Sequence, residues 1–302
     1  MKHAYTKRNA MEKHGSNSHL SGREQNDLRR IANKILDELS PLAIYYYGSH
    51  VTHQINRNYF SRNKKKEEWT TSYDLLVIAD DQFLPDEVNS SMRVEHDIRP
   101  IAHTHIIIHR WGFIEDQLIS GNFFFTWILR SAVKLYDRVH QFRQPAPPDS
   151  GNRFIDMHPD THMGYKTYMA QSERHLVKAE GYLSKKASYD ALEQLQYAME
   201  YALKAAAKAA ADYDFNTGDM ERIIGFLQGF LRLPNVFSTA TREEHRLYTL
   251  MTRAKGSPDR LPQKVTPGEV SVLIERAKLL RQWAVDLLFS NETVLRYSPT
   301  AK

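Results

Sequence analysis

The apolar residues near the start of the chain repeat with the period of an α-helix. Four of them share one helical face: Leu28, Ile31, Ile35 and Leu39. Ser21 and Glu24 stand three residues apart in front of this run, the spacing of a capping box in which each side chain bonds the other's backbone N–H. Pro41 follows the run and predicts its end.

The next hundred residues alternate between short apolar runs and helical patterns. The apolar runs, which we predict to be strands, cover residues 42–47, 73–79, 101–109 and 133–136. Helices are predicted after Pro85, over residues 84–97, and over 111–131, where Ser120–Gly121 divides the segment in two. Residues 50–71 are polar and irregular, which indicates a loop or an extended hairpin.

The second half of the chain is helical throughout. Helical faces are formed within residues 168–183, 192–206, 220–231, 241–254 and 266–287. Thr241 with Glu244 is a second capping box, and Thr266, Pro267 and Glu269 give a strong helix start. Five helices with short connections predict a bundle.

These patterns predict an α+β chain, in which an α/β domain with a short mixed sheet precedes an all-α bundle. Prolines and a glycine cluster between the halves, at Pro145, Pro147, Pro148 and Gly151. The predicted divisions are a flexible basic arm (1–20), the α/β domain (21–140), a linker (141–151) and the bundle (152–302). The arm holds Lys2, Lys7, Arg8 and Lys13, and also three histidines whose spacing is irregular for a metal site.

Composition adds a charge balance to this picture. The 302 residues are 41% hydrophobic and 25% charged, with a net charge of +5 and a pI of about 9.1. That balance is typical of a mildly basic globular protein, and it favours polyanionic partners such as nucleotides or RNA. Cysteine is absent, and no apolar stretch approaches the roughly 18 residues of a membrane span. We therefore expect a cytoplasmic protein without a membrane partner.

Two short motifs could carry chemistry. Gly48–Ser49 follows the first predicted strand, and a Gly–Ser turn leading into a helix can hold phosphate through backbone N–H groups and a hydroxyl. The alternative is an ordinary turn. Asp74 lies at the start of the apolar run 73–79, where a carboxylate needs either a partner or a task. The alternative there is a strand-edge cap.

These motifs resemble the nucleotidyltransferases of the polymerase-beta type. The segments YYYGS (45–49) and SYDLLVIA (72–79) are similar to the family's Gly–Ser strand and to its Asp-any-Asp strand. Residues 119–137 resemble the end of such domains in fusions with HEPN domains. The resemblance implies nucleotide binding by Gly48, Ser49 and Asp74, with Asp74 as a catalytic ligand of Mg²⁺ or Mn²⁺.

The helical half resembles HEPN domains. The run LQYAMEYALKAAAKAA (195–210) is similar to their core helix, TGDM (217–220) occupies the place of a Thr-His-Asp-Leu motif, and LYTLMTRA (247–254) is similar to their Tyr…Arg segment. The resemblance implies a ligand groove with Tyr248 and Arg253. The alternative for these two residues is core packing and a surface arginine. The Ala-rich helix at 190–211 and the resemblance together imply a homodimer.

Both halves depart from the families that they resemble. Ser72 replaces the first carboxylate of the pair, and residues 101–109 contain no acid, although His103 or His105 could serve as a ligand for Zn²⁺ or Mn²⁺ or could be structural. In the helical half only two residues separate Arg242 and His245, fewer than in HEPN ribonucleases. Gln196 and Gly218 also stand where many relatives have histidine.

Three functions remain. The first is a nucleotidyltransferase-like protein that binds a nucleotide or another phosphate ligand, with a degenerate, weak metal site and little or no transfer. The second is an RNA-binding or toxin–antitoxin-related HEPN module. The third is a dimeric regulatory scaffold without catalysis. Because a fold does not fix a function, the site has to decide.

Overall fold

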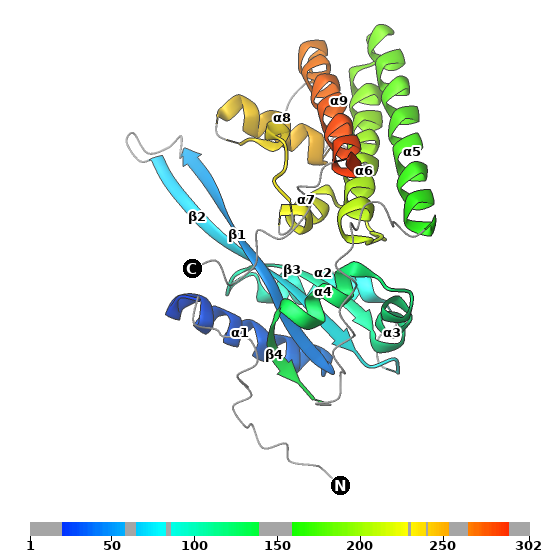
Figure 1. Ribbon diagram of the computed structural model, residues 1–302. Helices are drawn as coiled ribbons and strands as arrows, with labels where there is room; N and C mark the ends of the chain where they lie inside the picture. The colour runs from blue at the N-terminus through cyan, green and yellow to red at the C-terminus, as the bar shows by residue number, and fades with distance from the viewer. Residues whose placement is uncertain are drawn as a thin grey trace. The chain divides into compact units, whose positions relative to one another are not determined.

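The computed structural model describes residues 20–57, 65–82, 86–138, 159–228, 231–239, 241–253 and 265–289 (Figure 1). The predicted linker (141–151) lies outside these residues, and so does the predicted arm except for Leu20, which packs into the core. The chain forms two compact units. One comprises residues 1–51 and 70–147, and the other comprises residues 52–69 and 148–302.

A mixed four-stranded sheet with the strand order β3-β2-β1-β4 runs through the first unit, although residues 52–57 and 65–69, at the ends of two of its strands, belong to the second. The strands are β1 (Ala43–Arg57), β2 (Lys65–Ala79), β3 (His103–Arg110) and β4 (Val133–Asp137). β2 and β3 are parallel, and β4 is antiparallel to β1 with a register shift at Ile44/Tyr45. The helices are α1 (Gly22–Leu39), α2 (Glu87–Ile98), α3 (Trp111–Ile119) and α4 (Phe123–Ser131). The predicted α+β order of elements is therefore confirmed.

Local signals account for the helix boundaries in this unit. Ser21 and Glu24 form the predicted capping box at the start of α1. Asp86 caps α2 by accepting a hydrogen bond from the Asn89 N–H at 3.0 Å. Gly121 has a φ of +78°, which favours glycine and separates α3 from α4 as the sequence predicts.

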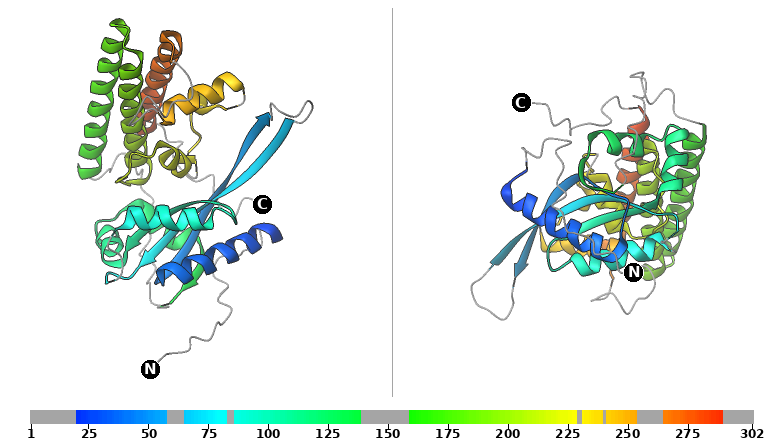
Figure 2. Two further views of the ribbon diagram at one scale, coloured as in Figure 1. Left: turned by 180° about the vertical axis from the view of Figure 1, so that it is seen from behind. Right: turned by 90° about the horizontal axis from the view of Figure 1, so that it is seen from below.

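The first strand differs from its prediction. β1 does not end at Tyr47 but continues through Gly48 and Ser49 to Arg57, so β1 and β2 form a hairpin of two 15-residue strands (Figure 2). The extended hairpin was one of two alternatives for residues 50–71 and is the correct one. β-Branched and aromatic residues, among them Val51, Ile55 and Trp69, favour extended backbone here and override the turn signal of Gly–Ser.

The sheet is covered on both faces. On one face, buried residues of α1 and α2, including Ile31, Ile35 and Val94, pack on Leu75 and Val77. On the other, aromatic residues of α4 meet the sheet, with the Tyr47 and Phe124 ring centroids 5.8 Å apart. Because β2 is buried on both faces, it is almost continuously apolar around Asp74.

The second unit contains α5 (Pro159–Ser184), α6 (Ser188–Ala211), α7 (Met220–Gln228), a 3₁₀ turn (Asn235–Phe237), α8 (Arg242–Arg253) and α9 (Pro267–Phe289). Both predicted helix starts are confirmed, because Thr241 and Glu244 bond reciprocally at 3.1 Å, and Thr266 and Glu269 bond reciprocally at 2.9 and 3.3 Å. None of the described helices is both long and apolar enough to cross a membrane.

The alanine-rich helix α6 is the centre of its own bundle. It packs against α5, α7, α8 and α9. Ala202, Ala205 and Ala206 have no exposed surface at all. Small side chains let the neighbouring helices approach α6 closely, so the alanine face is used within one chain and is not available to a second copy.

Candidate functional site

The candidate site is built around Asp74, which lies in the middle of the sheet. β2 carries it between β1 and β3, and its side chain is fully buried. The parallel register places Asp74 beside His105 of β3. His105 Nδ1 is 3.1 Å from Asp74 Oδ1, so a partly exposed imidazole contacts the buried carboxylate. This contact gives Oδ1 of the buried acid a hydrogen-bond partner.

Gly48 lies on the other side of Asp74. A Cβ placed on Gly48 would be 3.5 Å from Asp74 Oδ2, so the β1 backbone passes directly along the carboxylate. Ser49 follows it and is half-buried. The structure thus brings Gly48 close to Asp74. It contradicts the predicted local geometry, because both Gly48 and Ser49 lie within a strand and no helix begins after them.

Ser72 and His103 extend the site along β2 and β3. They are paired in the parallel register two residues before Asp74 and His105. Ser72 is buried, whereas much of His103 is exposed. Partial burial, and then the positive charges of Arg99 and His105, hold the pKa of His103 below its ordinary value. An anion near His103 would offset these charges.

The donors at this site do not fit a two-metal centre. Two divalent ions need several carboxylate oxygens, but Asp74 shares its site with a serine and two histidines. Within the described part of the chain, no three His, Asp or Glu side chains are grouped to hold a metal ion. Mg²⁺ or Mn²⁺ would depend on Asp74 and would compete with His105 for it.

Sequence reasoning missed a second carboxylate–imidazole pair. His109, at the end of β3, is buried with its Nδ1 2.8 Å from Glu87 Oε2, and Glu87 Oε1 accepts the Arg110 N–H at 3.1 Å. The His109 ring centroid lies 4.5 Å from that of Phe113 and 5.6 Å from that of Phe125. No sequence signal joined these residues, because α2 and β3 meet only in the folded sheet.

The residues of the helical unit that the sequence singled out lie on α8 and α6. Tyr248 is half-buried on α8, and Arg253 is the last residue of that helix, with a side chain outside those described. Arg242 and His245 are both exposed in the first turns of α8. Gln196 of α6 is buried and donates to the Thr252 carbonyl at 3.0 Å, which ties α6 to α8.

The motif at 217–220 has a local structural role. Asp219 Oδ1 accepts the Arg222 N–H at 3.3 Å, and the Asp219 N–H donates to Thr217 Oγ1 at 3.0 Å. Both bonds satisfy backbone N–H groups at the start of α7. In this chain, which has Gly218 where the HEPN motif has histidine, the motif forms the N-terminal cap of α7.

Comparisons with known proteins do not assign the chain to a family. No protein-family model and no curated protein matches it. Among solved structures it is similar to the nucleotidyltransferase-like protein from Exiguobacterium sibiricum 255-15, with 10% identity over 86% of this chain and 76% of that chain and a TM-score of 0.28. This TM-score is too low for any property of that protein to be transferred.

Proposed function

We propose that the sheet unit binds a nucleotide or another phosphate-bearing ligand beside Gly48, Ser49 and Asp74, and that it carries out little or no nucleotidyl transfer. The observation that carries this proposal is the contact of Asp74 with His105 at 3.1 Å. Where a transferase needs a cluster of carboxylates, this site pairs one carboxylate with an imidazole.

The donor groups favour an anion. Imidazoles at 103 and 105, the Ser49 hydroxyl and the Arg99 guanidinium can all donate hydrogen bonds, and His103 and Arg99 lie in the exposed part of the unit. Burial is the main cause of the lowered pKa of His103, and a phosphate nearby would relieve the repulsion by Arg99 and His105 that adds to it. The site therefore favours ligand binding that does not require a divalent ion.

Transfer demands more than binding. Negative charge gathers on the phosphates and on the departing pyrophosphate, and divalent ions held by acids ordinarily offset it. Ser72 brings no charge to this site, and the side chain paired with Asp74 on β3 is His105. Misplacement of a weakly held ion would lower the rate further.

A thermal-shift titration tests the binding. Purified protein is melted with ATP, CTP, GTP or UTP in Mg²⁺, Mn²⁺ or EDTA, because a ligand that binds only the native state raises the melting temperature. We expect at least one nucleotide to raise it, with a similar shift in EDTA. Ser49→Ala should reduce the shift, and Ser184→Ala, an exposed serine on α5, should not. The absence of a shift with every nucleotide would overturn the proposal.

Labelled nucleotides test the transfer. Incubation with each labelled triphosphate, a divalent ion and a cell extract as the source of acceptors should give no robust labelling. Robust labelling that disappears in Asp74→Asn would show that this site is catalytic and that another residue completes it.

A further inference from the structure

β3 forms one edge of the sheet in the part of the chain that the structure describes. It pairs with β2 on one side, and the strand order ends there. An edge strand has backbone N–H and C=O groups on its outer side that can pair with a strand of another molecule. β3 is suited to such pairing, because its centre consists of Ile106, Ile107 and Ile108, which are β-branched and carry no charge. A protein with this edge exposed would tend to associate through it.

Two glutamates of α2 bind the backbone at this edge. Glu95 Oε1 accepts the Ile106 N–H at 2.6 Å, and Glu87 Oε1 accepts the Arg110 N–H at 3.1 Å. Backbone groups of successive strand residues point to opposite sides, so residues 106 and 110 both direct their N–H groups away from β2. A strand of another chain would need these same donors. The two carboxylates therefore stand where the carbonyl groups of a neighbouring strand would lie.

The spacing of the two glutamates along α2 matches the spacing of their partners along β3. Glu87 and Glu95 are eight residues apart, which is about 12 Å along a helix. Ile106 and Arg110 are four residues apart, which is about 13 Å along a strand. The later glutamate binds the earlier strand residue, so α2 runs in the opposite direction to β3. A helix that lies along the edge can thus bind two outward N–H groups with one type of side chain.

Further contacts hold α2 against β3. Glu87 Oε2 lies 2.8 Å from His109 Nδ1, so one carboxylate bonds both a backbone group and a side chain of the strand region. Val94 and Ile98 of α2 have no exposed surface and belong to the same core cluster as Ile106. Apolar packing and the two glutamates therefore act together to keep α2 along the edge.

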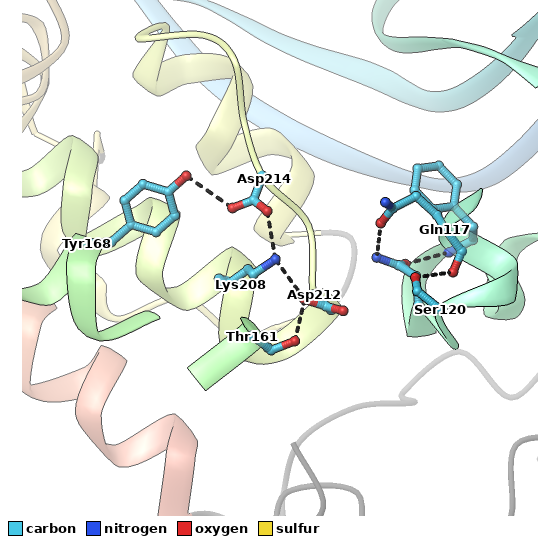
Figure 3. A network of polar contacts seen from close by, with 9 residues as sticks. Gln117, Ser120, Thr161, Tyr168, Lys208, Asp212 and Asp214 are labelled. Carbon is cyan, nitrogen blue, oxygen red and sulfur yellow. Dashed lines mark hydrogen bonds and ion pairs between the residues drawn. The ribbon is translucent and has the colours of Figure 1, made fainter. Parts of the chain in front are cut away.

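The end of β3 is also held in place. α3 follows β3 directly, and the last turn of α3 is bonded to the start of α4. Ser120 Oγ donates to the Gln117 carbonyl at 2.9 Å, and Asn122 Nδ2 donates to Gln117 Oε1 at 3.0 Å (Figure 3). Because β3 is fixed between β2 and this helix pair, a displacement of α2 is the movement that would expose its outer edge.

A second copy of the chain is the partner that this edge fits. Two β3 strands related by a two-fold axis would pair antiparallel, and each would present the same isoleucines to the other. The outward N–H groups of β3 would then donate to carbonyl groups of the other copy in place of the two glutamates. From this we infer that Glu87 and Glu95 form a latch along β3, and that this latch prevents β3 from pairing with the β3 of a second copy.

Amide hydrogen exchange of the full chain tests the latch in the wild-type protein. An outward N–H of an edge strand ordinarily faces water and exchanges readily, whereas an N–H that is bonded in the folded state is protected. We therefore expect slow exchange at Ile106 and at Arg110, although both N–H groups face away from β2. Rapid exchange at both positions would show that the glutamates do not hold this edge.

Substitution of Glu95 separates the hydrogen bond from the packing. Glu95→Leu keeps a side chain of similar size but removes the acceptor, so the Ile106 amide should exchange about tenfold faster. Glu95→Gln keeps an acceptor oxygen, and its Ile106 amide should exchange nearly as slowly as in the wild type. Melting curves establish that each variant is folded. Unchanged exchange at Ile106 in folded Glu95→Leu protein would contradict the inference.

Light scattering and thioflavin T fluorescence test the consequence for association. At tens of micromolar, Glu95→Leu should form assemblies larger than those of the wild type, with a rise in thioflavin T signal, because the opened edge can pair. The matched control is Glu115→Leu, which makes the same change of charge and side chain at an exposed position of α3. Equal association of the control would reduce the effect to a lost charge and refute the latch.

Hydrogen exchange within the assemblies identifies the surface that pairs. If β3 pairs with β3, the Ile106 amide of Glu95→Leu should become protected again on assembly, because a carbonyl group of the other copy replaces Glu95. Assemblies in which this amide still exchanges rapidly would have formed through another surface, and a second copy would then not be the partner of this edge.

Discussion

Two carboxylates of the sheet unit, those of Asp74 and Glu87, each have a histidine ring as a hydrogen-bond partner. Asp74 has His105 at 3.1 Å, and Glu87 has His109 at 2.8 Å. A charge-assisted hydrogen bond of this kind offsets part of the cost of burying the acid. At Asp74 the same contact engages Oδ1, and an oxygen that bonds an imidazole is a poorer ligand for a divalent ion.

Glu87 contributes to stability through its bond to His109. Burial by itself would raise the pKa of Glu87, but the hydrogen bond and charge of His109, together with the Arg110 N–H, lower it overall. Glu87→Gln should therefore reduce the free energy of unfolding at pH 7 by about 1–3 kcal/mol, since buried His109 loses a charged partner. Urea denaturation measures the change.

The pH dependence of this effect has a defined sign. A carboxylate whose pKa is lower in the folded state stabilises the protein above the pKa of an unfolded glutamate, about 4.3, and loses that contribution as the pH falls through the folded pKa. The gap between wild type and Glu87→Gln should stay constant from neutral pH to about pH 5 and shrink below it. Glu115→Gln, an exposed residue of α3, should show no gap.

Among the elements, the start of α9 joins two helices through one side chain. Glu269 accepts the Thr266 N–H at 2.9 Å within the capping box, and it also bonds Arg246 of α8, with Nη2 3.2 Å from Oε2. The hydrogen bond from Arg246 is the main cause of a pKa of about 2 for Glu269, and burial opposes it. One residue thus caps α9 and fixes α8 against it.

Glu269→Ala should cost about 1–3 kcal/mol of stability at pH 7, because it removes a cap and a bidentate ion pair together. Glu269→Gln keeps the cap and should cost less. Since the pKa is lowered, the contribution of Glu269 is present above about pH 4.3 and is lost as the pH falls toward about 2. Thermal melts across this range measure it.

Glu275→Gln is the matched control on the same helix. Glu275 is exposed and pairs with Lys278 at 3.1 Å. Exposed pairs of this kind contribute little, so the variant should change stability by less than about 0.5 kcal/mol. If Glu269→Ala were equally mild, the ion pair to α8 would have no energetic role.

For the molecule as a whole, we predict that two copies of the chain form a homodimer. The alanine face of α6 that suggested it is buried within its own bundle, so a dimer would have to use another surface, where exposed apolar residues such as Val272 and Leu279 lie on α9. Light scattering on the full chain at tens of micromolar should give twice the chain mass of 35.1 kDa. A monomer under these conditions would contradict the prediction.

The sequence by itself determined the local structure. Capping boxes at Ser21, Thr241 and Thr266 set helix starts, and apolar runs located the four strands, because these signals act between residues that are close along the chain. The α+β order followed from them. The resemblance to the nucleotidyltransferases also indicated a departure from their carboxylate site, since Ser72 and the histidines at 103 and 105 are visible without a structure.

Only the tertiary structure decided what these residues touch. The Gly48–Ser49 segment is a turn by local rules, yet pairing with β2 keeps it extended, because a long hairpin satisfies its backbone groups. The partner of Asp74 comes from the neighbouring strand β3, the partner of Glu87 on α2 comes from the same strand, and the His175 and Tyr201 rings meet only when α5 lies against α6. Contacts between residues distant in sequence depend on register and packing, which no local pattern of residues contains.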